Sequence, residues 1–465
     1  MPDDRDHGFR RSAARIGAFA SLSYAVDYSF QLVDIFWVAR LGAGAPTAIA
    51  IASSALFLVL ALNEVVGAGT VPLFAQAAGS GDRERTGHVI LQALLLKLVL
   101  GAVMALAFGA FMLWAAPLYD IGAAARGHLA AYGKVIWLSL LLVPACSTMM
   151  TALRSLGGEA DAARASVLAL LLNMALNPVL IFGVGSWPGL GIVGAAWATV
   201  LAQAAATVLA ARSLARNRFG ARVFSAANLE WCPHLYGAIA VIGLPLSGVM
   251  ALYNLEQAAV TAIAASFGTA VSDGFGIGAR ICGFLFMAVF GIAVGASVTV
   301  GLHLGAGRAD VVRRALPRFA GAGTAAFGAV ALPLALLGDE LVRLFTQNAA
   351  TVAAGGTYLR FMAAALCLLC AHHVFNAAFE GAGRNMPVLL ASAAMHLGVE
   401  LPAVLALAFL DALNPETLWA AMTVTAAVGA LLSALLFRHG GWLAEPLSTE
   451  SQKERPDKPL ARPSR

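Results

Sequence analysis

The chain has 465 residues, of which 60% are hydrophobic and only 12% carry a charge. A soluble protein of ordinary composition carries about 25% charged residues, so this composition excludes a soluble globular protein. The net charge of +5 is explained by basic loops at a membrane surface, and we therefore expect no nucleic acid among the partners.

Apolar stretches long enough to cross a bilayer recur along most of the chain. A transmembrane helix needs about 20 mainly apolar residues, and a chain with many such stretches is a helical membrane protein. We predict an all-α membrane protein with twelve transmembrane helices. The predicted spans are about 16–40, 47–77, 89–115, 129–152, 165–185, 190–212, 235–266, 272–303, 316–337, 355–381, 386–410 and 417–437.

The loops between these spans fall into two alternating sets, one rich in arginine and one poor in it. The rich set contains Arg83 and Arg85, Arg154 and Arg164, Arg212 to Arg222, Arg308 to Arg318, and Arg384. The positive-inside rule then places both termini in the cytoplasm of a multi-pass protein of the cell inner (plasma) membrane. The predicted cytoplasmic segments are the polar tail 1–15, the connector 213–234 and the disordered tail 438–465.

The sequence repeats itself with a period of about 225 residues. The segment 155–159 corresponds to 380–384, and Asn177-Pro178 corresponds to Leu401-Pro402. Each half holds an even number of spans, so both halves enter the membrane from the same side. The repeat is therefore parallel and predicts two pseudo-symmetric six-helix bundles, 16–212 and 235–437. This organisation is typical of transporters that rock two bundles around a central site.

The first span carries two acids, Asp27 and Asp34, two helical turns apart and on roughly the same face. A carboxylate at the bilayer centre costs about 2.5–3.5 kcal/mol on the lenient insertion scale. Burial disfavours the charged form of such a group, which suits a proton carrier. Asp34 is our first candidate for proton or ion coupling, and Asp27 either shares its cavity or lies near the interface. The alternative is a structural acid satisfied by a neighbouring helix.

Several short motifs, in the right order on this layout, resemble one transporter family. They are Val33-Asp34-Ile35 with Arg40-Leu41-Gly42, Asn173 with Asn177-Pro178, and Gly243-Leu244-Pro245. These stretches are similar to multidrug and toxic compound extrusion (MATE) transporters, nearer the prokaryotic DNA-damage-inducible-type branch. The resemblance implies a V-shaped pair of six-helix bundles. It also implies an antiporter that exports organic, often cationic, compounds in exchange for Na⁺ or H⁺.

Asn173 and Asn177 lie one turn apart, so both amides face the same way. Pro178 lacks an N–H and leaves a backbone carbonyl free one turn earlier. The resemblance implies an acid at position 177 in many relatives. Because Asn177 stands there in this chain, Asp34 lacks a second carboxylate beside it. Thr199 matches a position that lines the same cavity in the family. The alternative for the two asparagines is hydrogen bonding that holds helices together.

Span seven carries Asn254 and Glu256. Another branch of the resembled family keeps a glutamate as a cation or substrate site at about the position of Asn254. Two residues rotate a side chain by about 200°, so Glu256 can point to a different neighbour. We nevertheless assign Glu256 to ion or proton coupling and Asn254 to the cavity. Arg280, two turns into span eight, needs a partner, and Glu256 or Asp273 is expected to supply it.

Span ten contains Cys367-Leu-Leu-Cys370-Ala-His372-His373. Because a continuous apolar helix spreads these side chains around its surface, we predict no metal site here. His372 or His373 facing the cavity would supply a second titratable group, and packing is the alternative. No metal and no cofactor are expected, apart from H⁺ or Na⁺ as coupling ion.

The leading hypothesis is a secondary active antiporter that works by alternating access. We favour H⁺ over Na⁺ because two of the family's extra carboxylate positions hold other residues. The runner-up is a lipid-linked oligosaccharide flippase, although basic residues lie mostly in loops rather than in spans. An intramembrane enzyme is disfavoured by the lack of a Ser/Lys dyad, a zincin motif or a phosphate loop, so no enzyme is expected. The expected partners are a small organic substrate and membrane lipids, with the protein as a monomer.

Overall fold

The structure is a computed structural model, and it describes residues 2–42, 44–119, 121–217, 219, 223 and 232–442. The helices of the first half are α1 (Pro2–Val38), α2 (Ala45–Gly79), α3 (Arg83–Ala110), α4 (Ala123–Ile136), α5 (Ser139–Ser155), α6 (Glu159–Phe182) and α7 (Ile192–Arg216). Those of the second half are α8 (Pro233–Ser266), α9 (Thr269–Gly305), α10 (Ala309–Leu336), α11 (Gly338–Arg343), α12 (Ala349–Ala382), α13 (Met386–Met395), α14 (Leu401–Phe409) and α15 (Pro415–His439).

The predicted spans correspond to these helices. Among the residues that the structure describes, nine helical segments are long and apolar enough to cross a membrane. The pair α4 and α5, bent by 47°, makes a tenth. With α1 and α2, which are 37 and 35 residues long, these account for the twelve predicted spans. Helices α13 and α14 form one span through the π-helical turn η6 (His396–Glu400), and α3 continues into a second π-helical turn, η2 (Phe111–Ala115).

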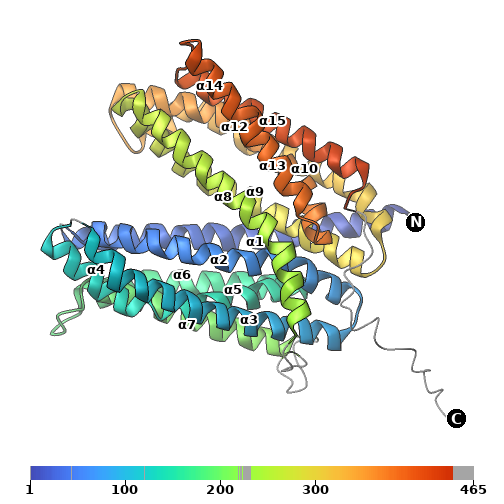
Figure 1. Cartoon of the computed structure of the whole chain (residues 1–465), viewed down its shortest axis with the longest axis horizontal. Coiled ribbons are helices and arrows are strands. Elements are labelled where there is room, and N and C mark those ends of the chain that lie inside the picture. The colour runs from blue at the N-terminus through green and yellow to red at the C-terminus, as the bar shows by residue number, and fades with distance from the viewer. Residues whose placement is uncertain are drawn as a thin grey trace.

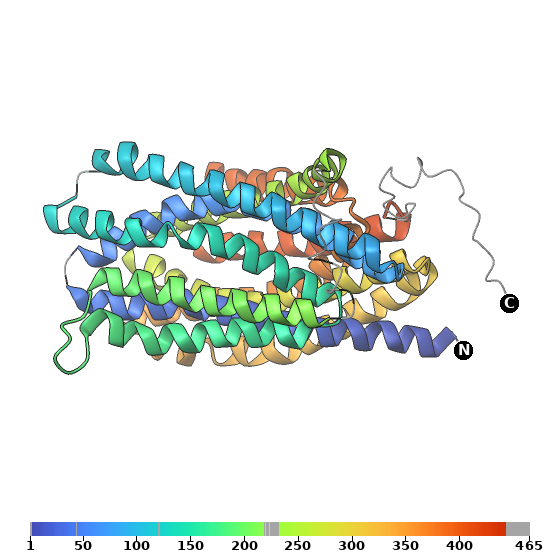
Figure 2. The same cartoon turned by 90° about the horizontal axis from the view of Figure 1, so that it is seen from below.

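The two halves of the sequence form two layers of helices. Helices α1 to α7 make one layer and α9 to α15 the other, while α8 contacts α2 near its start and α13 further along (Figure 1). Most helices run roughly along the long axis of the molecule (Figure 2). Helix α1 begins and α15 ends at the same end (Figure 1), which we call the terminal end. This arrangement agrees with the predicted pair of six-helix bundles.

The N-terminal segment differs from the predicted tail, because residues 2–15 are helical and continue directly into the first span. Phe9 and Ala13 are fully buried in a core cluster built mainly by the second half. Asp6 is also buried and contacts two arginines of α10, at 2.8 Å from Arg318 and 3.5 Å from Arg314. The mainly polar composition of this segment led us to predict a tail, although one face of its helix is apolar and one of its acids is buried. The predicted segments 213–234 and 438–465 lie largely outside the described residues.

The two halves approach most closely at the terminal end, where glycines allow backbone contact. A Cβ atom on Gly243 of α8 would lie 1.8 Å from the carbonyl oxygen of Val65 in α2, and one on Gly305 of α9 would lie 2.1 Å from that of Gln76. The Gln76 side chain donates a hydrogen bond to the carbonyl of Gly381 at 2.9 Å. The layers diverge toward the opposite end, which carries α4 and α14 (Figure 1). The molecule is thus closed at its terminal end and splayed at the other.

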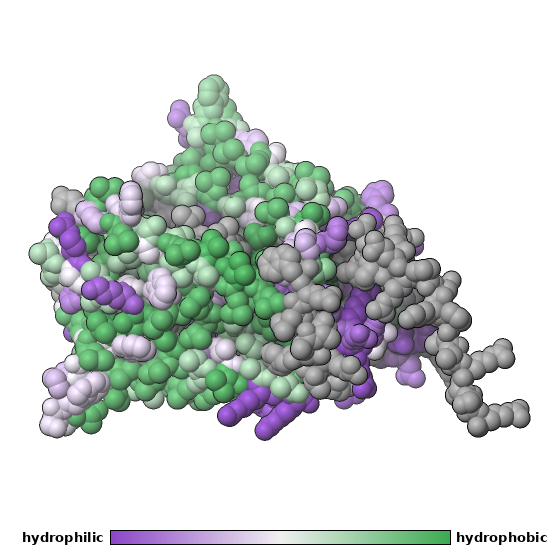
Figure 3. All heavy atoms as spheres, turned by 60° about the horizontal axis from the view of Figure 1, so that its bottom comes forward, coloured by the Kyte–Doolittle hydropathy of each residue, from purple (hydrophilic) through white to green (hydrophobic). Residues whose placement is uncertain are grey.

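The surface matches a protein surrounded by lipid. Large apolar side chains are exposed along the helices, among them Leu106, Val241 and Leu405. On the face shown in Figure 3, hydrophobic residues cover the middle and hydrophilic residues gather toward the ends. A soluble protein rarely exposes a contiguous apolar surface of this extent.

Candidate functional site

Asp34 of α1 lies at the centre of a polar cluster inside the N-terminal half. Its Oδ1 accepts hydrogen bonds from Nδ2 of Asn173, at 3.0 Å, and from Nδ2 of Asn177, at 2.9 Å. Its Oδ2 accepts a hydrogen bond from Oγ1 of Thr199 at 3.1 Å. Asn173 and Asn177 come from α6 and Thr199 comes from α7. The structure therefore brings together four residues from three helices, all of which the sequence analysis had named as candidates.

The cluster is held by bonds among its own members. Asn177 donates to Oδ1 of Asn173 at 3.0 Å, one turn away on α6. The Thr199 hydroxyl also lies 3.1 Å from the Ala195 carbonyl, so its single proton serves one of two acceptors. In the part of the chain that the structure describes, the buried Oδ1 of Asn177 has no hydrogen-bond partner. Asp34 thus faces three side-chain donors, and one acceptor of the cluster, Oδ1 of Asn177, is left over.

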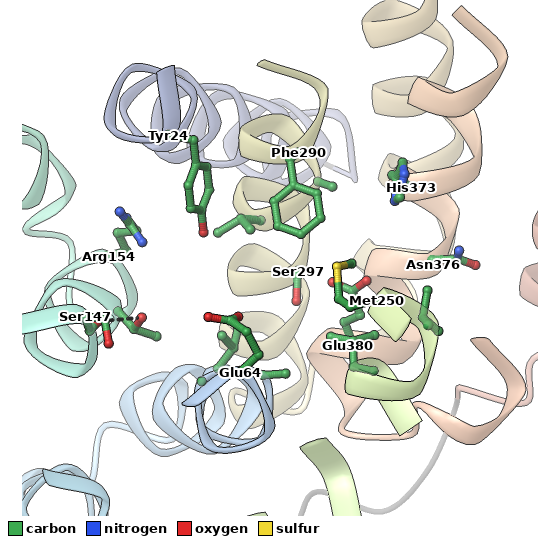
Figure 4. A pocket seen from close by; sticks show the side chains of 18 of the residues that line it. Tyr24, Glu64, Ser147, Arg154, Met250, Phe290, Ser297, His373, Asn376 and Glu380 are labelled. Atoms are coloured by element: carbon green, nitrogen blue, oxygen red, sulfur yellow. Dashed lines mark hydrogen bonds between the residues drawn. The ribbon is translucent and has the colours of Figure 1, made fainter. Parts of the chain in front are cut away.

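Asp27 lies apart from this cluster, in a cavity of about 210 Å³ between the two halves. The cavity is lined from both sides, with Tyr24, Glu64 and Arg154 on one side and His373, Asn376 and Glu380 on the other (Figure 4). The side chain of Asp27 is exposed to this space. The two acids of the first span therefore do not share one site.

Two basic residues of this cavity were not assigned a role from the sequence. Arg154 was placed in a basic loop, but it is buried and its guanidinium lies 5.2 Å from the centre of the Tyr24 ring. Lys97, in the middle of α3, is 1% exposed and donates to the Asn63 carbonyl at 2.6 Å. The position of Lys97 in the middle of an apolar span could have marked it as a cavity residue. The position of Arg154 could not, because this residue lies at the end of a span, next to a loop.

Of the two adjacent histidines, His373 faces the cavity with the freer side chain. The His372 ring lies 2.9 Å from Ser433 Oγ of α15 and 3.0 Å from Asn376 Nδ2 of its own helix, so both of its nitrogens already have hydrogen-bond partners. His373 lies between two aromatic rings, 5.4 Å from that of Phe286 and 6.1 Å from that of Phe290. The predicted cavity role of His372 is better fitted by its neighbour.

Glu256 lies in a separate cluster within the C-terminal half. Nδ1 of His396 is 3.5 Å from Oε2 of Glu256 and 3.0 Å from Oε2 of Glu400. Asn254 is exposed and, among the described residues, its side chain donates to its own helix alone, to the Met250 carbonyl at 2.7 Å. The two-residue offset thus turns Asn254 away from the Glu256 cluster.

The expected ion pair of Arg280 was wrong. Arg280 is exposed on α9 and, among the described residues, forms no ion pair with Glu256 or Asp273. Glu256 contacts His396 and Glu400 instead, and Asp273 lies two turns away from Arg280 on the same helix. Because the guanidinium reaches the surface, it needs no buried partner. It does not line the cavity between the halves.

Comparison with known proteins identifies relatives over most of the chain. A family model described as MatE matches residues 20–179 and 245–404, once in each half. "Probable multidrug resistance protein YoeA" of Bacillus subtilis is 22% identical, with 88% of this chain and 89% of that protein covered. A "Probable multidrug resistance protein NorM" of Bradyrhizobium diazoefficiens is 28% identical, with 87% of this chain and 88% of that protein covered. An "FAD transporter" of Shewanella oneidensis is 27% identical, with 62% of this chain and 63% of that protein covered.

Solved structures of MATE proteins have the same fold as this chain. A MATE protein in complex with MaL6 superposes with a TM-score of 0.84 at 21% identity, over 93% of this chain and 96% of the other. A variant of the Vibrio cholerae MATE transporter VcmN gives a TM-score of 0.85 at 18% identity, over 94% and 98%. The twofold match of the family model and these superpositions support the repeat of two six-helix halves.

Proposed function

This chain belongs to the MatE family of membrane transporters, and we propose that it is a secondary active antiporter that exports organic compounds in exchange for H⁺. The observation that carries the proposal is the Asp34 cluster, in which one half-buried carboxylate receives hydrogen bonds from three side chains of two other helices. A carboxylate in an apolar bundle is a functional site by default. The multidrug resistance names of the relatives support the export of organic compounds.

Protonation changes what Asp34 requires from its neighbours. The ionised carboxylate accepts from Asn173, Asn177 and Thr199, whereas a protonated one must donate one hydrogen bond itself. The unpartnered Oδ1 of Asn177 supplies a matching acceptor if that amide turns by half a rotation. Protonation would then exchange a donor for an acceptor between α1 and α6. This exchange links the charge of Asp34 to the packing of α1.

The proton fits the cluster better than Na⁺ does. Sodium is a hard cation that takes oxygen ligands, as the other hard cations do. The structure instead presents amide N–H groups and a hydroxyl to Asp34, and the position where a second acid would stand is Asn177. Sodium would require both amides to present their oxygens together. The proton requires one amide to turn.

The cavity between the halves is proposed to hold the substrate. Its charged lining consists of three acids, Asp27, Glu64 and Glu380, and two bases, Lys97 and Arg154. Tyr24, Phe290 and His373 add ring faces from both halves (Figure 4). Acids and aromatic faces together attract organic cations. Protonation of Asp34 in the state that is open at the splayed end would release the substrate there, before that end closes.

The terminal end is proposed to face the cytoplasm, because the arginine-rich loops lie there. Since this end is closed and the other is splayed, the structure then represents an outward-facing state. The transition would separate Gln76 from Gly381 and release Asp6 from Arg318. Both termini would remain cytoplasmic in a protein of the inner membrane.

The test is gradient-driven transport by the purified protein in proteoliposomes. A fluorescent organic cation should accumulate under an imposed pH gradient and not under a sodium gradient alone. Asp34→Asn should abolish uphill accumulation, while Asp411→Asn, a matched change in an exposed loop residue with a positive φ of 53°, should leave it unchanged. Accumulation that depends only on sodium, or that survives in Asp34→Asn, would contradict the proposal.

A further inference from the structure

The second cluster, in the C-terminal half, has the composition and geometry of a metal site. Glu256, His396 and Glu400 each offer one ligand atom, and these three atoms all lie within 4.8 Å of one another. Among the described residues no other group of three such side chains converges in this way. We propose that this cluster binds a divalent transition-metal ion, of which Zn²⁺ and Co²⁺ are the test cases.

The separations between the ligand atoms fit a coordination sphere. Zinc is held by His nitrogen and carboxylate oxygen at about 2.0–2.2 Å, usually with tetrahedral geometry. Neighbouring ligand atoms on such a tetrahedron are about 3.3–3.5 Å apart. Nδ1 of His396 is 3.0 Å from Glu400 Oε2 and 3.5 Å from Glu256 Oε2. One ring nitrogen therefore faces two carboxylate oxygens at the spacing of a metal ion's ligands.

A local change of helix type brings two of the ligands together. Residues His396–Glu400 form a π-helical turn between the α-helices α13 and α14. Such single turns occur inside α-helices mostly at functional sites. Pro402, just after the turn, cannot donate a backbone hydrogen bond, so the regular ladder is already interrupted there. The wider turn places His396 and Glu400 against the same partner on α8.

The charges of the cluster also favour a divalent cation. Glu256 and Glu400 are two acids in a membrane bundle, and like charges this close disfavour each other. Within the part of the chain that the structure describes, no lysine or arginine pairs with either acid. A divalent ion would balance both carboxylates, leaving a neutral imidazole as third ligand. The Glu256 and His396 side chains are 12% and 13% exposed, so neither is fully enclosed.

Three protein ligands leave a coordination position open. Closed structural zinc sites use four protein ligands, whereas sites with three keep a place for water or substrate. The proposed site is therefore suited to reversible binding rather than to a permanent structural ion. It lies in the other half from Asp34, so it does not rest on the proposed proton coupling.

The sequence analysis considered a metal site only in the Cys367–His373 stretch and predicted none there. Glu256 and Glu400 are 144 residues apart, and in a regular helix nothing marks His396 as turned toward α8. The four-residue spacing of His396 and Glu400 was visible, but many membrane helices carry such pairs. The expectation of no metal is thus revised at a place where only the fold assembles the ligands.

The test is Co²⁺ binding to tag-free protein in detergent, followed by the visible absorption of the bound ion and by its displacement with Zn²⁺. We expect one saturable site with the absorption of a four- or five-coordinate ion. Glu256→Gln, His396→Gln and Glu400→Gln should each weaken binding by roughly 10- to 100-fold or more. Glu416→Gln and His128→Gln, matched changes outside the cluster, should bind Co²⁺ as the wild type does.

Three results would overturn the assignment: no saturable Co²⁺ signal, binding unchanged in all three cluster variants, or equal losses in the two controls. If the three side chains only exchange protons with one another and bind no metal, no saturable Co²⁺ signal will appear. If Glu400→Gln does not fold, Glu400→Asp decides the question, because it keeps the charge and withdraws the carboxylate by one methylene. Weakened binding in that variant supports the site, and unchanged binding contradicts it.

Discussion

Asp34 of α1 accepts a hydrogen bond from Asn177 of α6 at 2.9 Å, across 143 positions of the sequence. The same amide donates to Asn173 at 3.0 Å, and its own oxygen is buried without a partner among the described residues. An unpaired buried acceptor normally costs about 1–3 kcal/mol. A protonated Asp34 would need an acceptor of this kind, and this is one basis for proposing the coupled proton at Asp34.

Asn177→Ala should weaken both stability and transport. The change removes a donor to Asp34 and one to Asn173, so we expect a loss of about 1–3 kcal/mol in the free energy of unfolding. Thermal unfolding in detergent and uptake driven by a pH gradient measure the two effects. Normal uphill transport by a folded Asn177→Ala protein would remove this residue from the coupling site.

Thr199 gives a finer comparison, because its hydroxyl can be removed or kept. Thr199→Val preserves the shape of the side chain and deletes the donor to Asp34, whereas Thr199→Ser keeps the donor. We expect Thr199→Val to shift the pH gradient needed for half-maximal transport by an amount that corresponds to about 1 kcal/mol. Thr199→Ser should behave as the wild type, and equal behaviour of the two variants would show that the hydroxyl is not used.

Gly243→Ala should open the terminal end. The added Cβ would lie 1.8 Å from the Val65 carbonyl oxygen, so α8 cannot keep its contact with α2. In a cysteine-free background, spin labels at Leu118 and Phe409, both exposed at the splayed end, report the distance between the layers. We expect this distance to shorten in Gly243→Ala as the molecule changes state. The control is Gly321→Ala, where an added Cβ meets nothing within 4 Å. An unchanged distance between the labels in Gly243→Ala would contradict the claim that the terminal end opens when the transporter changes state.

Asp6→Asn should destabilise the structure with the closed terminal end. Asp6 is 2% exposed and faces Arg314 and Arg318 of the other half. Because both arginines are about half exposed, solvent screens these ion pairs, and we expect a loss of about 1 kcal/mol in the free energy of unfolding. Thermal unfolding measures it, with the exposed Asp4→Asn as reference. Equal melting of the two variants would mean that the Asp6 contacts do not hold the halves together.

The sequence predicted the spans well, and it named the members of the Asp34 cluster, with Thr199 coming only from the family resemblance. Helical periodicity places Asn173 and Asn177 on one face, and a membrane gives Asp34 few polar neighbours other than those it meets there. Arg154 could not be placed, since its position near a loop fits either surface or cavity. The partner of Glu256 depended on a π-helical turn at 396–400, which a regular helical pattern cannot foresee. The helix at 2–15 was missed because its buried face is narrow.

The most direct measurement of the central claim is proton release on substrate binding. Purified protein in weakly buffered solution is mixed with a transported organic cation, and a pH indicator records the protons released. If proton and substrate binding are linked through Asp34, the wild type releases protons on binding. Asp34→Asn, which holds no titratable proton at this position, then releases none although it still binds the cation. Proton release that is unchanged in Asp34→Asn would contradict the account.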